Sequence, residues 1–401
     1  MKPITTDTRD FPKLRNKGCN YAAMNRREFL KLGMGALAAA GCSSARSGSS
    51  SYSVAVLGDV HFDAPDIGVY HAHYKPKPGS TASKIFPLRM KREHDQWSGL
   101  MQRLAAAARR DIRPDTRFVL QLGDLVQGNC AKASVHAKML EDGFAYFKST
   151  VSPDLPFVPV VGNHDVDQNC WLDKKPANEV FCETMFPKWS RELCRSVDST
   201  TFAFRQGPDL FLYADFNHPD HERILNLLED NADARYTFMV SHGAIVPVCP
   251  GKNFRWFMLG RKGWDAARRK LFSELCRRRA IALVGHNHAT SLADLKLPDG
   301  GRLTQFMATS VWSAENQALT PPKHTSREGY ARLPEATKDY NLSDARSLFA
   351  EYRPHVREFF FSGQQGRYLL EVSDKAVTMT MCGGDRAEAS RTFTLREATV
   401  A

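Results

Sequence analysis

The stretch VVGNHDVD, residues 160–167, decides how the rest of the chain is interpreted. It overlaps the apolar run FVPVV at 157–161 and places an amide, an imidazole and a carboxylate side by side in Asn163, His164 and Asp165. A short, nearly continuous apolar run is typical of a strand that is buried on both faces. Because three adjacent polar side chains at the end of such a strand have no packing role, we interpret them as part of a functional site.

The same arrangement occurs five times along the chain. Short apolar runs, each ending in a small residue followed by polar groups, lie at 54–57, 118–122, 157–161, 237–240 and 281–284. Apolar residues at helical spacing separate some of these runs, over 97–108 and 264–275. Alternating strands and helices predict an α/β fold with parallel strands, whose carboxyl ends gather functional side chains along one edge.

The polar residues behind the five runs form a donor set that suits metal ions. Two carboxylates, one amide oxygen and four imidazoles come from Asp59, His61, Asp124, Asn163, His242, His286 and His288. Seven donors exceed one ordinary site and predict two ions that share a bridging carboxylate. Oxygen and nitrogen donors suit Mn, Fe or Zn, as divalent or trivalent ions. Of the three adjacent residues that follow the run at 157–161, His164 and Asp165 are not in this donor set and are predicted to be catalytic. His164 would face the substrate, and Asp165 would orient the ring of His164.

The order of these motifs resembles the calcineurin-like metallophosphoesterase superfamily, whose pattern is DxH, GD, GNH(D/E), a lone H and GHxH. The resemblance implies a four-layer α/β/β/α sandwich and hydrolysis of phosphoric esters by a bridging hydroxide at a dinuclear metal centre. It implies that one ion is held by Asp59, His61, Asp124 and His288. It implies that the other is held by Asp124, Asn163, His242 and His286, with Asp124 as the bridge. His164 would then protonate or stabilise the leaving oxygen.

The metallophosphoesterase domain is expected over 53–401. Near its end, RYLLEV and AVTMTM at 367–372 and 376–381 predict a hairpin that completes one of the sheets. Two long, loop-like segments at 63–92 and 311–365 depart from a minimal family member. Inserted loops over a site at strand ends are natural places for substrate selection.

The N-terminal segment has the features of an export signal. NRREFLKLGMGALAAAGC at 25–42 resembles a bacterial twin-arginine signal, with Arg26 and Arg27 before an apolar run too short to span a bilayer. Residues 39–42 resemble a lipoprotein processing box, with Cys42 as the acylated residue. We therefore expect a leader over 1–42, a flexible tether over 43–52, and a periplasmic or membrane-anchored product.

The charge of the chain does not require a nucleic-acid partner. The formal net charge is +11, of which the first 42 residues contribute +5, from eight Lys and Arg against three Asp and Glu, leaving +6 for the remainder. That excess suits attraction of a small phosphate-ester substrate. Because the seven cysteines beyond residue 42 contain no CxxC pair, a zinc ribbon is excluded. A nuclease of the same superfamily and a non-catalytic metal-binding scaffold remain the alternatives.

The residue at position 127 bears on which branch of the superfamily this chain resembles. Purple acid phosphatases place a tyrosine three residues after the bridging aspartate, where its phenolate binds ferric iron, whereas this chain has Gln127 there. An amide supplies no anionic oxygen, so a divalent pair is expected. The resemblance then implies a place nearer the phosphodiesterase branch of the superfamily, which favours phosphodiesterase over phosphomonoesterase activity. His71, His73 and His94 fall outside the ligand pattern and are expected on the surface or in a substrate loop.

Overall fold

The computed structural model describes residues 51–64, 66, 68–75, 97–167, 171–248, 255, 257–261, 263–310, 326–336 and 342–397. The chain divides into the units Met1–Ser47 and Gly48–Ala401, and every described residue belongs to the second unit. The predicted leader with Arg26, Arg27 and Cys42, and also His94, lie outside the described residues. Among the residues that are described, no helix combines the length and the apolar character that crossing a membrane requires.

Two sheets form the centre of this unit. The first has six strands in the order β13-β12-β11-β1-β2-β3. Their bounds are Tyr52–Leu57 for β1, Thr116–Gln121 for β2, Phe157–Pro159 for β3, Gly366–Val372 for β11, Ala376–Gly383 for β12 and Arg391–Glu397 for β13. Strands β1, β2 and β3 are parallel, whereas β11, β12 and β13 extend the sheet as an antiparallel meander beside β1.

The second sheet has seven strands in the order β10-β8-β9-β7-β6-β5-β4. Their bounds are Phe202–Gln206 for β4, Asp209–Ala214 for β5, Thr237–Ser241 for β6, Ile281–Val284 for β7, Thr290–Lys296 for β8, Arg302–Met307 for β9 and Val356–Ser362 for β10. Strands β5, β6, β7 and β9 are parallel.

The apolar residues of the second sheet divide between two hydrophobic cores with the period of two expected for a strand. In β5, Phe211 belongs to the core shared with the first sheet, where its ring centroid lies 5.0 Å from that of Phe118, whereas Leu212 belongs to a separate core. In β7, Leu283 and Val284 divide in the same way. Because both faces of these strands are buried, their sequences are apolar without interruption.

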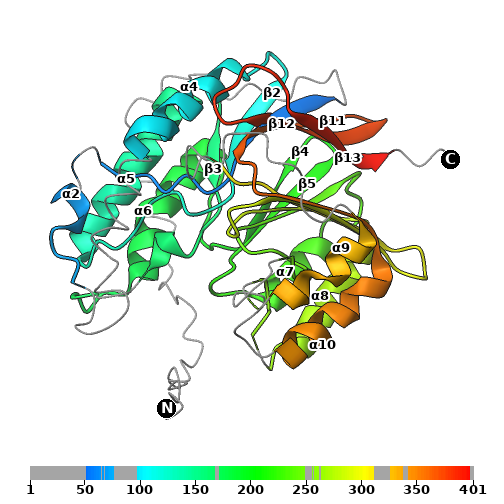
Figure 1. Ribbon diagram of the computed structural model, residues 1–401. Helices are drawn as coiled ribbons and strands as arrows, with labels where there is room; N and C mark the ends of the chain where they lie inside the picture. The colour runs from blue at the N-terminus through cyan, green and yellow to red at the C-terminus, as the bar shows by residue number, and fades with distance from the viewer. Residues whose placement is uncertain are drawn as a thin grey trace, which may run out of the picture. The chain divides into compact units, whose positions relative to one another are not determined.

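Helices cover the outer faces of the two sheets (Figure 1). The first sheet carries α4 (Gln102–Arg110), α5 (Ala133–Thr150) and α6 (Ala177–Glu192), and the second carries α7 (His221–Glu229), α8 (Asp265–Arg277), α9 (Arg327–Ala331) and α10 (Leu342–Tyr352). Short helical turns lie at Gly68–His71, Trp97–Met101, His164–Val166, Leu333–Ala336 and Arg353–His355. The order helix, sheet, sheet, helix confirms the predicted α/β/β/α sandwich.

The predicted strands and hairpin are confirmed. The five apolar runs correspond to β1, β2, β3, β6 and β7, and the hairpin to β11 and β12. Pro159 is tolerated because β3 is the edge strand of its sheet, where one side of the backbone needs no partner.

The expectation that 311–365 is loop-like is wrong for its described part. This part contains α9, α10 and the edge strand β10, which pairs antiparallel with β8. The buried residues of α10 follow the helical spacing i, i+3, i+4, i+7, as Ala345, Leu348, Phe349 and Tyr352. That spacing was visible in the sequence. Of the other expected insertion, 76–92 lies outside the described residues.

Candidate metal centre

All nine predicted site residues lie where parallel strands of the two sheets end. Asp59 and His61 follow β1, Asp124 follows β2, Asn163, His164 and Asp165 follow β3, His242 follows β6, and His286 and His288 follow β7. The carboxyl ends of parallel strands meet at one edge, where open α/β sheets place their ligands. The two sheets therefore each contribute part of one site.

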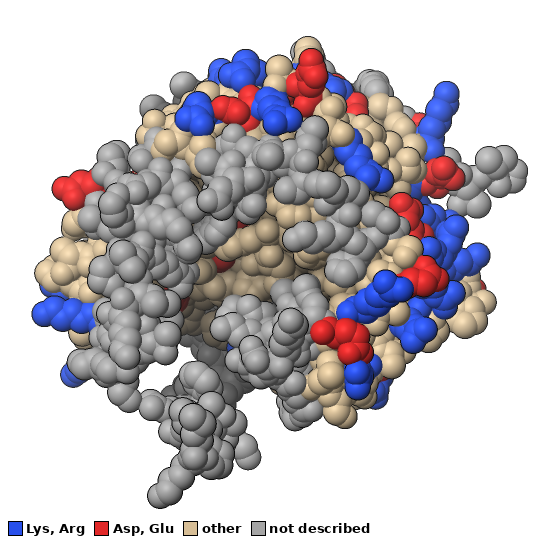
Figure 2. Space-filling view, in the orientation of Figure 1, with Lys and Arg blue, Asp and Glu red and all other residues tan. Residues whose placement is uncertain are grey.

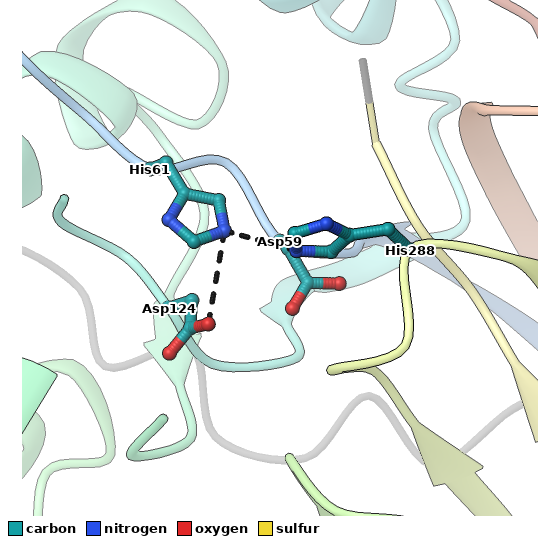
Figure 3. Close-up of side chains that lie close together, drawn as sticks. All are labelled: Asp59, His61, Asp124 and His288. Carbon is teal, nitrogen blue, oxygen red and sulfur yellow. Dashed lines mark hydrogen bonds and ion pairs between the residues drawn. The ribbon is translucent and has the colours of Figure 1, made fainter. Parts of the chain in front are cut away.

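One group of possible ligands joins both sheets (Figure 3). Ligand atoms of Asp59, His61, Asp124 and His288 all lie within 4.8 Å of one another. Nε2 of His61 is 3.2 Å from Nε2 of His288 and 3.7 Å from Oδ2 of Asp124. The backbone N–H of His286 donates to both oxygens of Asp59, at 2.9 and 3.2 Å, which fixes that carboxylate.

A second group shares Asp124 with the first. Ligand atoms of Asp124, His242 and His286 lie within 4.8 Å of one another. Nε2 of His242 is 3.2 Å from Oδ2 of Asp124, 3.1 Å from Nδ1 of His286 and 3.1 Å from Oδ1 of Asn163. The seven predicted ligands thus form two adjoining groups with Asp124 in both, in the division that the family resemblance implies.

The hydrogen bonding of His242 fits a bound cation. Its Nδ1 lies 2.8 Å from the carbonyl oxygen of Leu122, and because a carbonyl only accepts, Nδ1 carries the proton. In a neutral ring Nε2 is then a lone pair, and it faces the oxygens of Asn163 and Asp124, which also lack a proton. A metal ion held by His242, Asn163 and Asp124 would satisfy these atoms. A ligating histidine that donates its other N–H to a carbonyl is a common feature of metal sites.

The pKa shifts of the buried Asp and His side chains also fit a bound cation. Burial raises the pKa of Asp59 to about 7. Burial also opposes ionisation of Asp124, but His242 and His164 outweigh it and hold the pKa of Asp124 well below its usual range. Burial lowers the pKa of His242, yet the carboxylates of Asp124 and Asp59 raise it to about 9. A proton on His242 therefore compensates the carboxylates when no cation is bound, and a metal ion would replace it.

Four of the predicted ligands have backbone conformations that are uncommon for residues other than glycine. Positive φ angles of 43°, 52°, 77° and 46° occur at His61, Asp124, His286 and His288. Such conformations cost on the order of 1–3 kcal/mol for each residue and persist where the surrounding structure enforces them, often at functional sites. Four predicted ligands thus occupy conformations that local sequence preference would not choose.

Two glycines explain the recurring small residue before the polar groups. A Cβ atom at Gly162 would collide with the backbone nitrogen of Asp124. A Cβ atom at Gly123, where φ is 86°, would lie 2.6 Å from Nδ1 of His242. The strands can bring their ligands together only because no side chain stands at these positions.

His164 lies beside the first ligand group. Its ring centroid is 4.6 Å from that of His61, with the ring planes at 86°. The backbone N–H of His164 donates to Oδ1 of Asp124 at 2.8 Å, and its Nδ1 donates to the carbonyl oxygen of Gln127 at 2.8 Å. The ring is therefore fixed by the backbone of the loop after β2, and Nε2 is the nitrogen left for a substrate.

The predicted role of Asp165 in orienting His164 is wrong. The carboxylate of Asp165 accepts hydrogen bonds from the backbone N–H groups of Val126, at 3.0 Å, and Gly162, at 2.8 Å. Residues 164–166 form one 3₁₀ turn, in which consecutive side chains point about 120° apart. Adjacency in the sequence therefore does not bring the two side chains together, and Asp165 instead joins the loops after β2 and β3.

Of the two positions expected for His71, the surface or a substrate loop, the surface is wrong. Nε2 of His71 lies 3.1 Å from both carboxylate oxygens of Asp63, and both side chains are buried. His73 is exposed, as expected. Neither histidine belongs to the two ligand groups.

Sequence reasoning missed a loop beside the site. The ring centroid of Phe216 lies 5.1 Å from that of His286 and 6.1 Å from that of His242. Nδ2 of Asn217 donates to the carbonyl oxygen of Gly162 at 3.1 Å. The signal was present, because β5 is an apolar strand that ends in a small residue followed by Asp215, as the recognised strands do.

Comparison with known proteins places the chain in a family. The Calcineurin-like phosphoesterase family model matches residues 52–290, more than half of the chain. None of the curated proteins compared with the chain matches it.

Solved structures with a similar course of the chain include GAP50, the anchor in the inner membrane complex of Plasmodium, and PhoD. The first is 13% identical, with 87% of this chain and 90% of that chain covered and a TM-score of 0.42. The second is 10% identical, with 87% and 72% covered and a TM-score of 0.48. Likeness at this level carries no argument about activity. The match of the family model over residues 52–290, around a group of buried Asp and His side chains that could hold metal ions, shows that the chain belongs to the calcineurin-like phosphoesterase family.

Proposed function

We propose that this phosphoesterase hydrolyses phosphoric esters with two metal ions, and that diesters are favoured over monoesters. The observation that carries the proposal is the position of Asp124. One of its carboxylate oxygens lies 3.2 Å from Nε2 of His242 and 3.7 Å from Nε2 of His61, so it reaches both ligand groups. A carboxylate in this position can bridge two ions.

The donor set determines which ions fit. Carboxylate, amide and imidazole donors without a thiolate suit Mn, Fe or Zn. When bound, two such ions supply Lewis acidity, which activates a water molecule and neutralises the charge on the phosphoryl oxygens. The residues that would hold them are Asp59, His61, Asp124, Asn163, His242, His286 and His288.

His164 has the geometry of a general acid. With Nδ1 donating to the carbonyl oxygen of Gln127, only Nε2 can transfer a proton to a substrate. In its protonated form the ring can give that proton to the oxygen of the departing alcohol. Asp165 acts on this step only through the loops that it joins.

The alternatives have less support. A non-catalytic scaffold needs neither seven converging ligands nor a histidine fixed beside them, and all eight residues are present. A nuclease would use a positive stripe along a nucleic-acid path. On the face drawn in Figure 2, the described Lys and Arg side chains are interspersed with Asp and Glu.

Location is proposed from the sequence pattern at 25–42 alone. We place the protein outside the cytoplasm, exported by the twin-arginine route and either periplasmic or anchored through a lipid on Cys42. Twin-arginine export carries folded proteins, which suits a site that must acquire its metals before export.

One assay tests the reaction class. The purified protein is loaded with Mn²⁺, Zn²⁺ or Fe²⁺ and offered an aryl phosphate monoester and the matching aryl methyl diester. Hydrolysis that requires metal, with the higher kcat/KM for the diester, is the expected result. Higher kcat/KM for the monoester would refute the preference, and no hydrolysis of either ester by any loaded form would refute the proposed function.

A further inference from the structure

A buried glutamine lies between the two strands that lead to the predicted ligands Asp59 and Asp124. Gln121 is the last residue of β2 and pairs with Leu57, the last residue of β1. The residue is 0% exposed. Because a buried amide costs free energy unless its polar atoms have partners, the hydrogen bonds of Gln121 indicate why it stands in an otherwise apolar part of the strand.

The carboxamide of Gln121 binds the backbone directly before both ligands. Its Nε2 donates to the carbonyl oxygen of Gly58 at 2.9 Å and to that of Gly123 at 2.5 Å, and its Oε1 accepts the N–H of Gly123 at 3.2 Å. Gly58 precedes Asp59, and Gly123 precedes Asp124. The bonds to Gly123 hold a turn in which φ is 86° at Gly123 and 52° at Asp124. One side chain therefore fixes the start of two ligand loops.

These bonds lie where the two strands become loops. The N–H of Leu122 donates to the carbonyl oxygen of Leu57 at 2.9 Å, and further along the N–H of His61 donates to the carbonyl oxygen of Asp124 at 2.9 Å. The carboxamide of Gln121 joins the two chains between these main-chain bonds. The spacing between the loop of Asp59 and the loop of Asp124 thus depends on a side chain that is itself no ligand.

Ser310 fixes the first of these loops from the other sheet. The N–H of Gly58 donates to Oγ of Ser310 at 2.9 Å, and Ser310, which follows β9, is fully buried. A Cβ atom at Gly58 would lie 2.5 Å from the carbonyl oxygen of Ala308 and from Cα of Thr309, so the close approach of these segments requires glycine. Gly58 is therefore bonded at its N–H by Ser310 and at its carbonyl by Gln121.

We propose that Gln121 and Ser310 are positioning residues that determine how tightly the first ligand group binds its ion. The inference rests on the proposed function, because it concerns the same ions. Gln121 supports two of the four predicted ligands of the first group, Asp59 and Asp124, but only one of the four in the second group, Asp124. Ser310 supports Asp59 alone. Removing either side chain leaves every ligand present but less well placed, so the two ions should respond unequally.

Stepwise Zn²⁺ affinities test this inference. Both Kd values are measured by competition with a chelating dye, on the metal-free full chain and on Gln121→Met and Ser310→Ala. Gln121→Met keeps roughly the length of the side chain and removes the amide, and Ser310→Ala removes only a hydroxyl. His61→Ala, which lacks a ligand of the first group alone, identifies the binding step of that group as the step that it loses.

The matched control is Tyr52→Phe, at the other end of β1. The hydroxyl of Tyr52 donates to Oδ2 of Asp209 at 2.9 Å, and both residues are buried. Tyr52 stands six residues before Gly58, which is roughly 20 Å along a strand. This variant therefore loses a buried hydrogen bond of the same strand without touching the ligand loops. Denaturant unfolding of each protein shows that the variants fold and how much stability each has lost.

The expected result is a selective loss of affinity. Gln121→Met should weaken the first-group step by about tenfold or more and the other step by less, on the scale of partners that orient metal ligands. Ser310→Ala should weaken the first-group step by a smaller factor and leave the other step unchanged. Tyr52→Phe should lower stability and leave both steps unchanged.

The inference is overturned by unchanged affinities in Gln121→Met, and equally by a loss in Tyr52→Phe that matches the loss in Gln121→Met. Should Gln121→Met not fold, Ser310→Ala decides, and an unchanged first-group step there overturns the inference. The proposed function fails separately. Unequal weakening of two ions in a protein that hydrolyses no ester would leave the positioning roles and remove the reaction. A single binding step in the unaltered protein would refute the two-ion proposal, and the inference would then stand or fall on whether Gln121→Met weakens that step.

Discussion

Nδ1 of His164 donates a hydrogen bond to the carbonyl oxygen of Gln127 over 2.8 Å. This bond determines which ring nitrogen is available to a substrate, and it comes from backbone, so it does not depend on the side chain at position 127. The ring held in this way lies beside a predicted ligand, since its centroid is 4.6 Å from that of His61.

The first prediction concerns that ring. His164→Ala is expected to retain both metal ions and to lose roughly 10²- to 10⁴-fold in kcat, because a positioned acid contributes on that scale. The loss should be smaller for esters with good leaving groups, which need no proton. Metal analysis and kcat for a series of aryl leaving groups check this. The same loss for every leaving group would instead indicate purely electrostatic stabilisation.

A second prediction separates Asp165 from His164. Asp165→Asn replaces one oxygen that accepts a backbone N–H by an amide nitrogen, which leaves the N–H of Val126 or Gly162 unsatisfied. An unsatisfied buried donor costs about 1–3 kcal/mol of unfolding free energy. Denaturant unfolding should register this cost, while the dependence of kcat on the leaving group stays as in the unaltered protein. A leaving-group dependence like that of His164→Ala would restore the orienting role.

A third prediction concerns colour. An intense colour would require a tyrosine phenolate bound to ferric iron, and Gln127 cannot supply one. Tyr368 is the tyrosine whose pKa is influenced by the predicted ligand Asp59, and it is buried. Its hydroxyl donates to the carbonyl oxygen of Thr309 at 2.9 Å, and burial raises the pKa of Tyr368, which opposes a phenolate. The iron-loaded protein should therefore lack an intense visible charge-transfer band. An intense band that disappears in Tyr368→Phe would contradict this.

A fourth prediction concerns export. Replacing Arg26 and Arg27 together by Lys should keep active enzyme in the cytoplasm, because the twin-arginine route requires the pair. Fractionation followed by the ester assay measures where activity lies. Undiminished activity outside the cytoplasm would refute the interpretation of residues 25–42 as a twin-arginine signal.

The strand ends could be predicted because each carries a local signature. A buried run, a glycine and then Asp, Asn or His is readable without the fold, and the glycines at 123 and 162 are explained by the atoms that a Cβ would strike. The two ligand groups followed from the family resemblance. Their distances and positive φ angles could not be predicted, since they depend on how two sheets meet.

Other features depend on contacts between distant segments. The carboxylate of Asp165 faces Val126, 39 residues away, and not its neighbour His164. His71 is buried because Asp63 and the loop after β2 surround it, although its sequence context is polar. The loop over 215–218 contains none of the seven predicted metal ligands, so a search of the sequence for metal ligands does not identify it. Sequence patterns identify donors better than they identify the residues that position them.

The most direct test of the central claim is the metal content and activity of Asp124→Asn. The amide keeps the size of the side chain and an oxygen that can accept the backbone N–H of His164, but it loses the charge that both ligand groups share. Metal analysis after dialysis, with the ester assay, is compared with Asp230→Asn, an exposed control at the end of α7. We predict two ions and full activity for the control, and fewer than one ion with at least a roughly 10³-fold loss of kcat/KM for Asp124→Asn, about 4 kcal/mol of transition-state stabilisation. Two retained ions with most of the activity would contradict a bridging Asp124 and the dinuclear centre built on it.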